Sequence, residues 1–362
     1  MNRRLLVIAL ILALAVALTA WFATLPPPTP GRPALAYLAP SAGPYQVWMV
    51  QDTARPLTDA PDGVYDFAIS RDGRSLVYSE VQANAPDSTE LVLLDLQTNV
   101  TRRLTDCTTQ NATCAHPVWR PDGTVIAYER TEAGDAMPRL WLLDLSTTPI
   151  NNFPLFQESQ IYGSDPQWSG DGGRLAFYDA ATQSVLVYNF NATDERLRLQ
   201  ALRFSDGVTG ALSPDGARLV YPELIVDTPV RAEFRIADLL TGAFADLTPD
   251  DIPTSDRAVA WHPDGERVVI SRRYLDENYT AGDQLYSVML ATGAAERLIY
   301  DPAYQHSSPT WSADGRYLAL HRYALADGSN DTTPEIWVYE AATKALTRVA
   351  TDSFEPQWVE NK

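Results

Sequence analysis

A motif that recurs about every 49 residues restricts the fold of this chain more than any other feature of its sequence. Each copy contains an apolar segment, an Asp-Gly pair, an alternating apolar run, a variable stretch and a second apolar run. The pairs are Asp72-Gly73, Asp122-Gly123, Asp171-Gly172, Asp215-Gly216, Asp264-Gly265 and Asp314-Gly315. A tight hairpin turn needs a residue with positive φ, which glycine adopts without strain. Each copy therefore predicts two strands joined by a tight turn.

The segments after each hairpin predict two more strands per copy. The third segment reads ELVLLDL in the first copy and RLWLLDL in the second, and a weaker fourth segment such as TRRLTD follows. Apolar residues alternate with a period of two, whereas a helical solenoid needs a period of about 3.6. The pattern predicts an all-β chain in which four antiparallel strands repeat, as in the blades of a β-propeller.

The repeat spacing predicts the number of blades. The Asp-Gly pairs are 48.4 residues apart on average, so the 330 residues from 33 to 362 correspond to about 6.8 copies. The segment SFEPQWVE at 353–360 matches a first strand, and residues 34–59 contain matches to the second, third and fourth strands. We therefore expect seven blades, one of them completed by strands from both ends of the chain, which removes exposed sheet edges. Six blades with a loosely packed N-terminal hairpin are the alternative.

The N-terminal segment predicts insertion into a membrane. Arg3 and Arg4 precede a run without charged residues from Leu5 to Leu25, and three prolines follow. A helix of this length can span the hydrocarbon core of a bilayer, and the arginines on its N-terminal side predict that this end stays in the cytoplasm. The rest of the chain is then extracytoplasmic.

These features divide the chain into three predicted parts. Residues 1–25 are expected to be a signal anchor or transmembrane helix, residues 26–33 a Pro-rich spacer, and residues 34–362 the propeller. Cleavage near Ala15-Val16-Ala17 is the alternative, and it would release a secreted protein.

Charge and cysteine content restrict the partners and the compartment. The chain has 46 acidic and 28 basic residues, and its formal net charge is −18. Such a surface repels phosphate backbones, so we do not expect a nucleic-acid partner. Cys107 and Cys114 are the only cysteines. Outside the cytoplasm they are expected to form a disulfide, with two free thiols as the alternative.

Several recurring residues have a structural explanation. Tryptophan recurs at one repeat position, which predicts packing between neighbouring blades rather than a stacking surface for sugars or bases. These tryptophans are Trp119, Trp168, Trp261, Trp311 and Trp358. Asp95, Asp144 and Asp238 recur before a turn, where a carboxylate can accept backbone N–H bonds. His262 takes a position that is serine in most copies, and we expect it to be a surface turn residue.

One repeat position is expected to form a ring at the mouth of the central channel. It lies three residues before the aligned tryptophan, where the innermost strand of each blade begins. The ring consists of Asp66, His116, Asp165, Thr209, Ala258, Ser308 and Glu355. The candidate ligand-binding residues in it are Asp66, His116, Asp165, Ser308 and Glu355. Its three carboxylates are also a candidate Ca²⁺ or Mg²⁺ site, because these cations prefer several oxygen ligands.

The ring also has interpretations that need no ligand. It can be a solvated acidic rim, or Asp66 and Asp165 can accept bonds from nearby backbone N–H groups. Arg257 is next to the ring in sequence and can neutralise one carboxylate, which weakens the case for a metal. His306 and His321 are expected toward the same end of the propeller as His116, but their spacing does not show that the three converge. We therefore expect no resident cofactor, with Ca²⁺ at the ring as the exception to test.

The blocks Trp-Ser-x-Asp-Gly-x-x-Leu-Ala-Phe and Ile/Leu-Trp-x-x-Asp-Leu-x-Thr resemble the WD40-like repeats of TolB-type β-propellers over nearly all of residues 34–360. The resemblance implies the fold and leaves the function open, because such propellers serve as partner-binding platforms, as substrate gates in prolyl-oligopeptidase-type enzymes and, rarely, as lyases. The chain has no Gly-x-Ser-x-Gly motif and ends at Lys362 without an α/β-hydrolase domain, so we do not expect a peptidase. It also lacks the separate N-terminal domain expected of TolB itself.

These observations predict a membrane-anchored, extracytoplasmic and non-catalytic scaffold that binds a protein or a component of the cell envelope. Loops on the channel-mouth face are expected to supply the contacts, because a rigid ring positions loops that can vary. The longest of these are at 80–89, 131–138, 222–232, 272–283 and 322–334. The alternative is a glycan-directed enzyme similar to oligouronide lyases, or a lectin, that acts at the same face.

Overall fold

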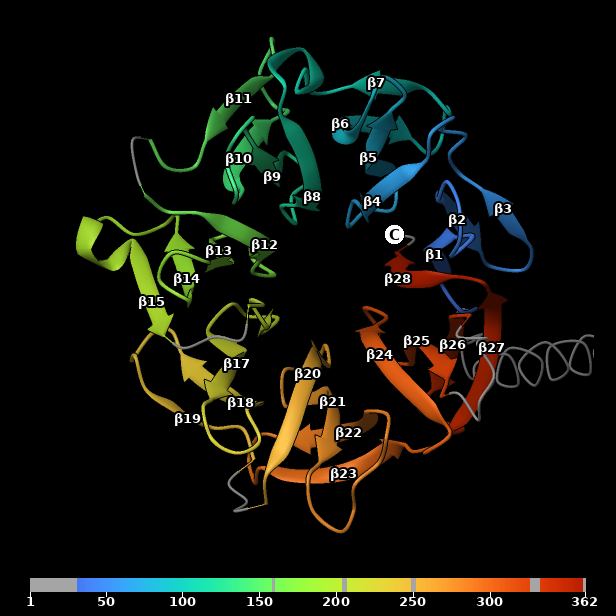
Figure 1. Ribbon diagram of the computed structural model, residues 1–362, viewed down its shortest axis with the longest axis vertical. Coiled ribbons are helices and arrows are strands. Elements are labelled where there is room, and N and C mark those ends of the chain that lie inside the picture. Colours follow the sequence, from blue (N-terminus) through green and yellow to red (C-terminus); the bar gives the residue numbers. More distant parts are fainter. Residues whose placement is uncertain (1–30, 158–159, 204–206, 249–251, 326–332, 361–362) are drawn as a thin grey trace, which may run out of the picture. The chain divides into compact units, whose positions relative to one another are not determined.

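The computed structural model describes residues 31–157, 160–203, 207–248, 252–325 and 333–360 (Figure 1). In this part of the chain, strands form seven four-stranded antiparallel sheets arranged around a central channel. The prediction of an all-β, seven-bladed propeller is confirmed, and the six-bladed alternative is wrong. The described residues contain only two short 3₁₀ helices, η1 (Thr108–Gln110) and η2 (Glu195–Leu197).

Six blades are each built from four consecutive strands that run in order from the channel to the rim. Blade I contains β4 (Val64–Ile69), β5 (Ser75–Gln82), β6 (Ala85–Asp95) and β7 (Thr101–Arg103). Blade II contains β8 (Thr113–Trp119), β9 (Val125–Thr131), β10 (Arg139–Asp144) and β11 (Asn151–Pro154). Blade III contains β12 (Gly163–Trp168), β13 (Arg174–Asp179), β14 (Ser184–Asn189) and β15 (Leu199–Arg203).

The second half of the ring continues in the same way. Blade IV contains β16 (Ala211–Leu212), β17 (Arg218–Ile225), β18 (Arg231–Asp238) and β19 (Phe244–Asp246). Blade V contains β20 (Thr254–Trp261), β21 (Arg267–Tyr274), β22 (Gln284–Met289) and β23 (Ala294–Ile299). Blade VI contains β24 (Tyr304–Trp311), β25 (Tyr317–Ala324), β26 (Glu335–Glu340) and β27 (Ala345–Thr351).

Blade VII closes the ring with strands from both ends of the propeller. It contains β28 (Phe354–Val359), β1 (Ala34–Ala39), β2 (Gln46–Val50) and β3 (Ala54–Pro56). Antiparallel pairing of β1 with β28 joins Ala34 to Val359. Across the next interface, Gln357 Nε2 donates to the Phe67 carbonyl of blade I at 2.9 Å. The predicted closure by strands from both termini is therefore confirmed.

The Asp-Gly turns have the expected backbone. Their six glycines have φ between 67° and 73°, a region that side-chain-bearing residues rarely adopt. In four turns a buried serine donates its hydroxyl hydrogen to the aspartate two residues later, as Ser169 does to Asp171 at 2.5 Å. His262 replaces this serine, and the prediction that it lies at the surface is wrong. It is buried, and its Nε2 lies 3.2 Å from the Gly315 carbonyl of the next blade, because these turns pack against the neighbouring blade.

The recurring tryptophans join neighbouring blades, as predicted. Trp119 Nε1 donates to the Ala68 carbonyl at 3.1 Å, and Trp261 Nε1 donates to the Ala211 carbonyl at 2.8 Å. In both pairs the acceptor belongs to the innermost strand of the preceding blade. The carboxylates of the recurring aspartates also accept backbone N–H bonds, as expected, for example from Gln97 to Asp95 at 2.9 Å.

Cys107, in the loop between blades I and II, forms a disulfide with Cys114 at the start of β8. The buried carboxylate of Glu90 on β6 holds one end of this loop, because it accepts bonds from Cys107 N at 2.9 Å and Thr108 N at 2.8 Å. Burial alone raises the pKa of Glu90, but these bonds and one from the Thr105 hydroxyl together lower it. The predicted Cys107–Cys114 disulfide is thus present beside an ionised, hydrogen-bonded carboxylate.

The predicted membrane anchor at residues 1–25 lies outside the described residues, as does most of the spacer at 26–33. Within the described ranges, no helix is long and apolar enough to cross a membrane.

Candidate functional site

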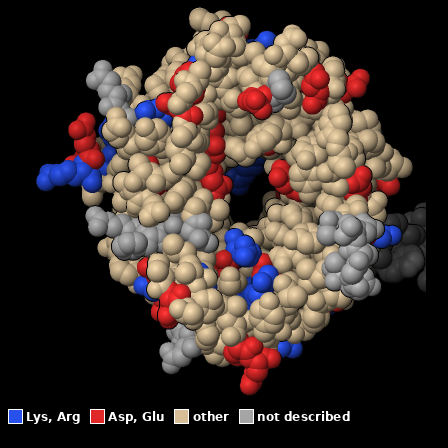
Figure 2. All heavy atoms as spheres, viewed as in Figure 1, with Lys and Arg blue, Asp and Glu red and all other residues tan. Residues whose placement is uncertain are grey.

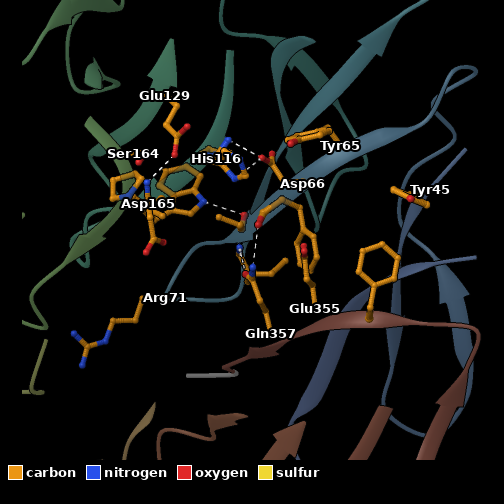
Figure 3. Close-up of a pocket in the computed structure, with 18 of the residues that line it drawn as sticks. Tyr45, Tyr65, Asp66, Arg71, His116, Glu129, Ser164, Asp165, Glu355 and Gln357 are labelled. Carbon is orange, nitrogen blue, oxygen red and sulfur yellow. Dashed lines mark hydrogen bonds and ion pairs between the residues drawn. The ribbon is translucent and has the colours of Figure 1, made fainter. Parts of the chain in front are cut away.

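A cavity of about 790 Å³ opens at the mouth of the channel. Blades I, II, III and VII line it, and we call it the channel-mouth cavity. Its polar side chains include Asp66, His116, Glu129, Asp165 and Glu355 (Figure 3). Aromatic rings lie among them, from Tyr45, Tyr65, Trp119 and Phe354. Figure 2 shows the opening of the channel, with acidic atoms on parts of its wall and a group of basic atoms over β20.

A β-bulge places the ring residues at the channel mouth. Pairing of the innermost strand with its neighbour shifts register around Asp66, His116, Asp165, Ser308 and Glu355. The last four have φ between 48° and 53°, a left-handed backbone that costs energy in residues other than glycine. A bulge adds one residue to a strand and redirects its side chains. The aligned repeat position therefore coincides with a backbone bulge that recurs in several blades.

Asp66 is almost fully buried and fixes the position of His116. Its Oδ2 accepts the backbone N–H of His116 at 2.6 Å and lies 3.1 Å from the imidazole Nδ1. The Ser79 hydroxyl donates to its other oxygen. Burial raises the pKa of Asp66, although His116 and these hydrogen bonds partly oppose the rise. The imidazole is held by Nδ1, and half of the His116 side chain is exposed at the cavity.

Glu129 on β9 is a cavity residue that the sequence analysis missed. Its Oε1 accepts the backbone N–H of Asp165 at 2.7 Å, and Figure 3 shows its side chain beside His116. Burial is the main cause that raises the pKa of Glu129 to about 7, and the charges of Asp165 and Asp66 add to the rise. The sequence does contain a pattern that marks this position. A polar residue interrupts the apolar second strand at the same repeat position in four copies, as Ser79, Glu129, Ser271 and His321.

Glu355 on β28 extends the acidic wall toward blade VII. Burial raises its pKa, and the nearby charge of Asp66 adds to the rise. Tyr65 stands between the acidic groups with 52% of its surface exposed, and its ring meets the His116 ring edge to face at 5.5 Å between centroids. Burial and the charges of Asp66, Glu129 and Glu355 raise the pKa of its hydroxyl. The cavity is therefore a place where negative charge is crowded.

The structure brings together most of the predicted site residues. Asp66, His116, Asp165 and Glu355 line the channel-mouth cavity. Ser308 lines a smaller cavity of about 370 Å³ on the other side of Asp165. The interpretation that two of the aspartates accept backbone bonds is confirmed, because Asp66 accepts one from blade II and Asp165 Oδ2 accepts one from Thr209 of blade IV at 2.8 Å.

The metal prediction rested on Asp66, Asp165 and Glu355. Among the described residues, no group of three or more His, Cys, Asp or Glu side chains is placed to hold a metal ion. Calcium binding at the ring remains a prediction. The expectation that Arg257 neutralises a ring carboxylate is wrong, because its Nε pairs instead with the buried Asp283 at 3.2 Å.

His306 and His321 do not join His116. Neither lines the channel-mouth cavity, and burial lowers the pKa of each imidazole to about 4. His306 Nδ1 lies 3.3 Å from the Asp283 carbonyl, so it belongs to the packing between blades V and VI. Both rings are neutral at physiological pH and serve as packed core side chains.

No protein-family model and no curated protein matches this sequence. Solved structures share the fold. TolB from Acinetobacter baumannii is 15% identical with a TM-score of 0.52, over 90% of this chain and 66% of the TolB chain. An oligogalacturonate lyase in complex with manganese is 16% identical with a TM-score of 0.61, over 88% of this chain and 85% of the lyase.

A puromycin-hydrolyzing peptidase of Mycobacterium tuberculosis is also similar, with 16% identity and a TM-score of 0.63, but this chain covers only 51% of the peptidase. Identity this low establishes the fold alone. The chain has the TolB-type β-propeller fold that its repeats predicted, and this fold occurs both in TolB and in enzymes.

Proposed function

We propose that this protein is an extracytoplasmic, membrane-anchored scaffold that binds a basic segment of a partner protein or cell-envelope component at the channel mouth. The observation that carries the proposal is the channel-mouth cavity, where four carboxylates from four blades surround an open volume of about 790 Å³. Aromatic rings in the same wall add apolar surface and faces that attract cations. Such a wall suits a lysine or arginine side chain of an incoming segment.

The raised pKa values support a cationic ligand. Like charges that are crowded and partly buried disfavour ionisation, and a positive group among them relieves that cost. A bound ammonium or guanidinium group therefore lowers the pKa of Glu129 from about 7 and promotes its ionisation. Binding of a basic segment should accordingly strengthen as the pH rises through 7 in the absence of other titrations.

The charge of the cavity disfavours the glycan-lyase alternative. Oligogalacturonate is a polyanion, and Asp66, Glu129, Asp165 and Glu355 would repel it. Arg71 is the only lysine or arginine among the described residues that line this cavity. The similarity to the manganese-bound lyase is one of fold, and its substrate class does not match this wall.

Two observations support the extracytoplasmic location. The Cys107–Cys114 disulfide is typical of an oxidising compartment, and the apolar run from Leu5 to Leu25 is long enough for an anchor. The fold similarity to TolB fits a protein of the cell envelope.

Peptide binding by the full-length chain in detergent tests the proposal. We expect a lysine-rich peptide to bind, and its lysine-acetylated and glutamate-substituted forms to bind at least about tenfold more weakly. Combined Glu129→Gln and Glu355→Gln substitutions should remove most of this preference. Glu340→Gln, on the outer part of blade VI, is the matched control. Equal binding of the lysine-rich and acetylated peptides would reject a basic ligand.

A further inference from the structure

Opposite the acidic wall, blade V presents an arginine whose position is fixed by a buried acid. Arg257 lies in the bulge of β20, and its side chain is 63% exposed. Its Nε pairs with Asp283 Oδ2 at 3.2 Å, and the Asp283 side chain is completely buried. In the described part of the chain, Asp283 is the only polar partner of this guanidinium. One edge of the guanidinium is thus held by the protein while the rest faces the channel.

The charges of this cluster do not cancel. Asp283 also pairs through Oδ1 with Arg273 Nη2 at 3.0 Å, so a single carboxylate serves two guanidinium groups. Gln305 Nε2 donates to Oδ2 at 2.8 Å, and Gln305 Oε1 accepts the backbone N–H of Asp283 at 2.9 Å, which fixes the carboxylate further. We call Arg257, Arg273 and Asp283 the arginine clamp. Its net charge is +1, and Arg257 is its exposed member.

The arginine clamp and the acidic wall line neighbouring cavities that have one residue in common. Arg257 lines the cavity of about 370 Å³ together with Ser308, Gly210 and Asp165. Asp165 also lines the channel-mouth cavity, so the two cavities meet at this residue. A ligand that reaches from one cavity to the other meets carboxylates on one side and a guanidinium on the other. Figure 2 shows a group of basic atoms over β20 with acidic atoms beside it, and more acidic atoms on other parts of the channel wall.

We infer that Arg257, held by the buried Asp283, binds a carboxylate of the segment that enters the channel mouth. A guanidinium that is anchored through Nε still has its Nη groups to donate parallel hydrogen bonds, and a carboxylate matches that geometry. A carboxylate carries one negative charge, whereas a phosphate group carries up to two and would be repelled more strongly by the nearby acids. Pre-positioning by Asp283 lowers the entropy lost when the ligand binds.

This inference rests on the proposed function and narrows the partner. The bound segment carries a basic group for the acidic wall and, next to it, a carboxylate for Arg257. The carboxylate is either a chain terminus or the side chain of an aspartate or glutamate. Arg348 offers a contrast, because its side chain is 54% exposed but its partner Glu335 lies on β26 of blade VI and lines neither cavity.

The experiment uses the full-length chain in detergent and one short N-acetylated lysine peptide in three forms. The first ends in a free carboxylate, the second in an amide, and the third in an amide with a glutamate beside the lysine. We expect at least one carboxylate form to bind about tenfold more tightly than the plain amide, as one charge-assisted contact predicts. The form that gains affinity identifies the source of the carboxylate.

Two variants test whether the higher affinity of the carboxylate peptide depends on the arginine clamp. Arg257→Gln should abolish the advantage of the carboxylate form, and Arg348→Gln, a matched loss of an exposed guanidinium, should leave it unchanged. An advantage that survives Arg257→Gln, or no advantage in the wild type, overturns the inference. If the plain lysine amide still binds in that case, the basic-segment proposal is kept and only the role of Arg257 is rejected. A fourth peptide with alanine in place of lysine tests the reverse, because binding that depends on Arg257 but not on lysine would reject the basic-segment proposal and keep the clamp.

Discussion

The two sides of the channel mouth stabilise buried carboxylates in different ways. On the acidic wall, Asp66 and Glu129 accept backbone N–H bonds and keep raised pKa values. In blade V, Asp256 and Asp283 are paired with arginines. Asp66 and Asp256 lie on the bulged innermost strands, whereas Glu129 lies on a second strand and Asp283 at the end of a loop. The neighbouring residues then decide whether each acid is paired with a cation. One side is left with excess negative charge and the other with an exposed guanidinium.

The largest expected effect comes from breaking the arginine-paired side. Asp256 Oδ1 accepts Arg272 Nε at 2.6 Å, and both side chains are buried. Burial acts to lower the pKa of Arg272, but Asp256 raises it above its usual value, so the guanidinium stays charged. Asp256→Asn leaves this charge unpaired and should lower the free energy of unfolding by about 3–5 kcal/mol in urea titrations. A loss below about 1 kcal/mol would show that the pair contributes little.

The acidic wall should give the protein an unusual dependence on pH. A carboxyl group whose pKa is raised in the folded state binds its proton more tightly there than in the unfolded chain. For Glu129 the folded value is about 7 and the reference is 4.5, so its contribution is fully present below about pH 4.5 and is lost as the pH rises through 7.

The size of this effect is on the order of 2 kcal/mol for Glu129 alone. Urea titrations between pH 5 and pH 8 measure it, compared with Glu129→Gln, which should remove the slope that Glu129 contributes. Glu266→Gln, at an exposed position in the turn before β21, is the control. A wild-type slope that persists unchanged in Glu129→Gln would contradict the assignment.

The smallest effect is expected for Asp66→Asn. An amide keeps an oxygen that accepts the backbone N–H of His116, and it removes a carboxylate whose ionisation burial already disfavours. The loss should be about 1 kcal/mol, from the weakened contacts to His116 and Ser79. If Asp66→Asn costs as much as Asp256→Asn in the same urea titration, the two sides do not differ as described.

The sequence predicts the fold better than it predicts the site. The Asp-Gly spacing and the match of residues 353–360 to a first strand were sufficient to predict seven blades and their closure. Several copies of one motif support the same prediction, so an irregular copy does not change it. The same alignment found Asp66, Asp165 and Glu355. Glu129 is not at the aligned ring position, because it lies on the second strand of its blade; its signal is a polar residue in a buried strand, which usually needs a partner.

The arginine clamp could not be derived from the repeat. Arg257 is beside an aligned position, but Asp283 ends a long loop that has no counterpart of fixed length in the other copies. The path of that loop, and not the repeat, brings Asp283 under Arg257. The prediction that His262 is exposed was wrong for a related reason, because its burial depends on the neighbouring blade and not on its own turn.

Pairing of β1 with β28 also has a consequence for how the protein is made. These strands lie at opposite ends of the propeller sequence, so the first strand to leave the ribosome waits for the last before it gains its inner partner. Until then β1 presents an unpaired edge, and joining distant segments carries a large loss of chain entropy. During synthesis the incomplete ring is therefore the form most exposed to mispairing, and a chain cut short before residue 354 remains in that state.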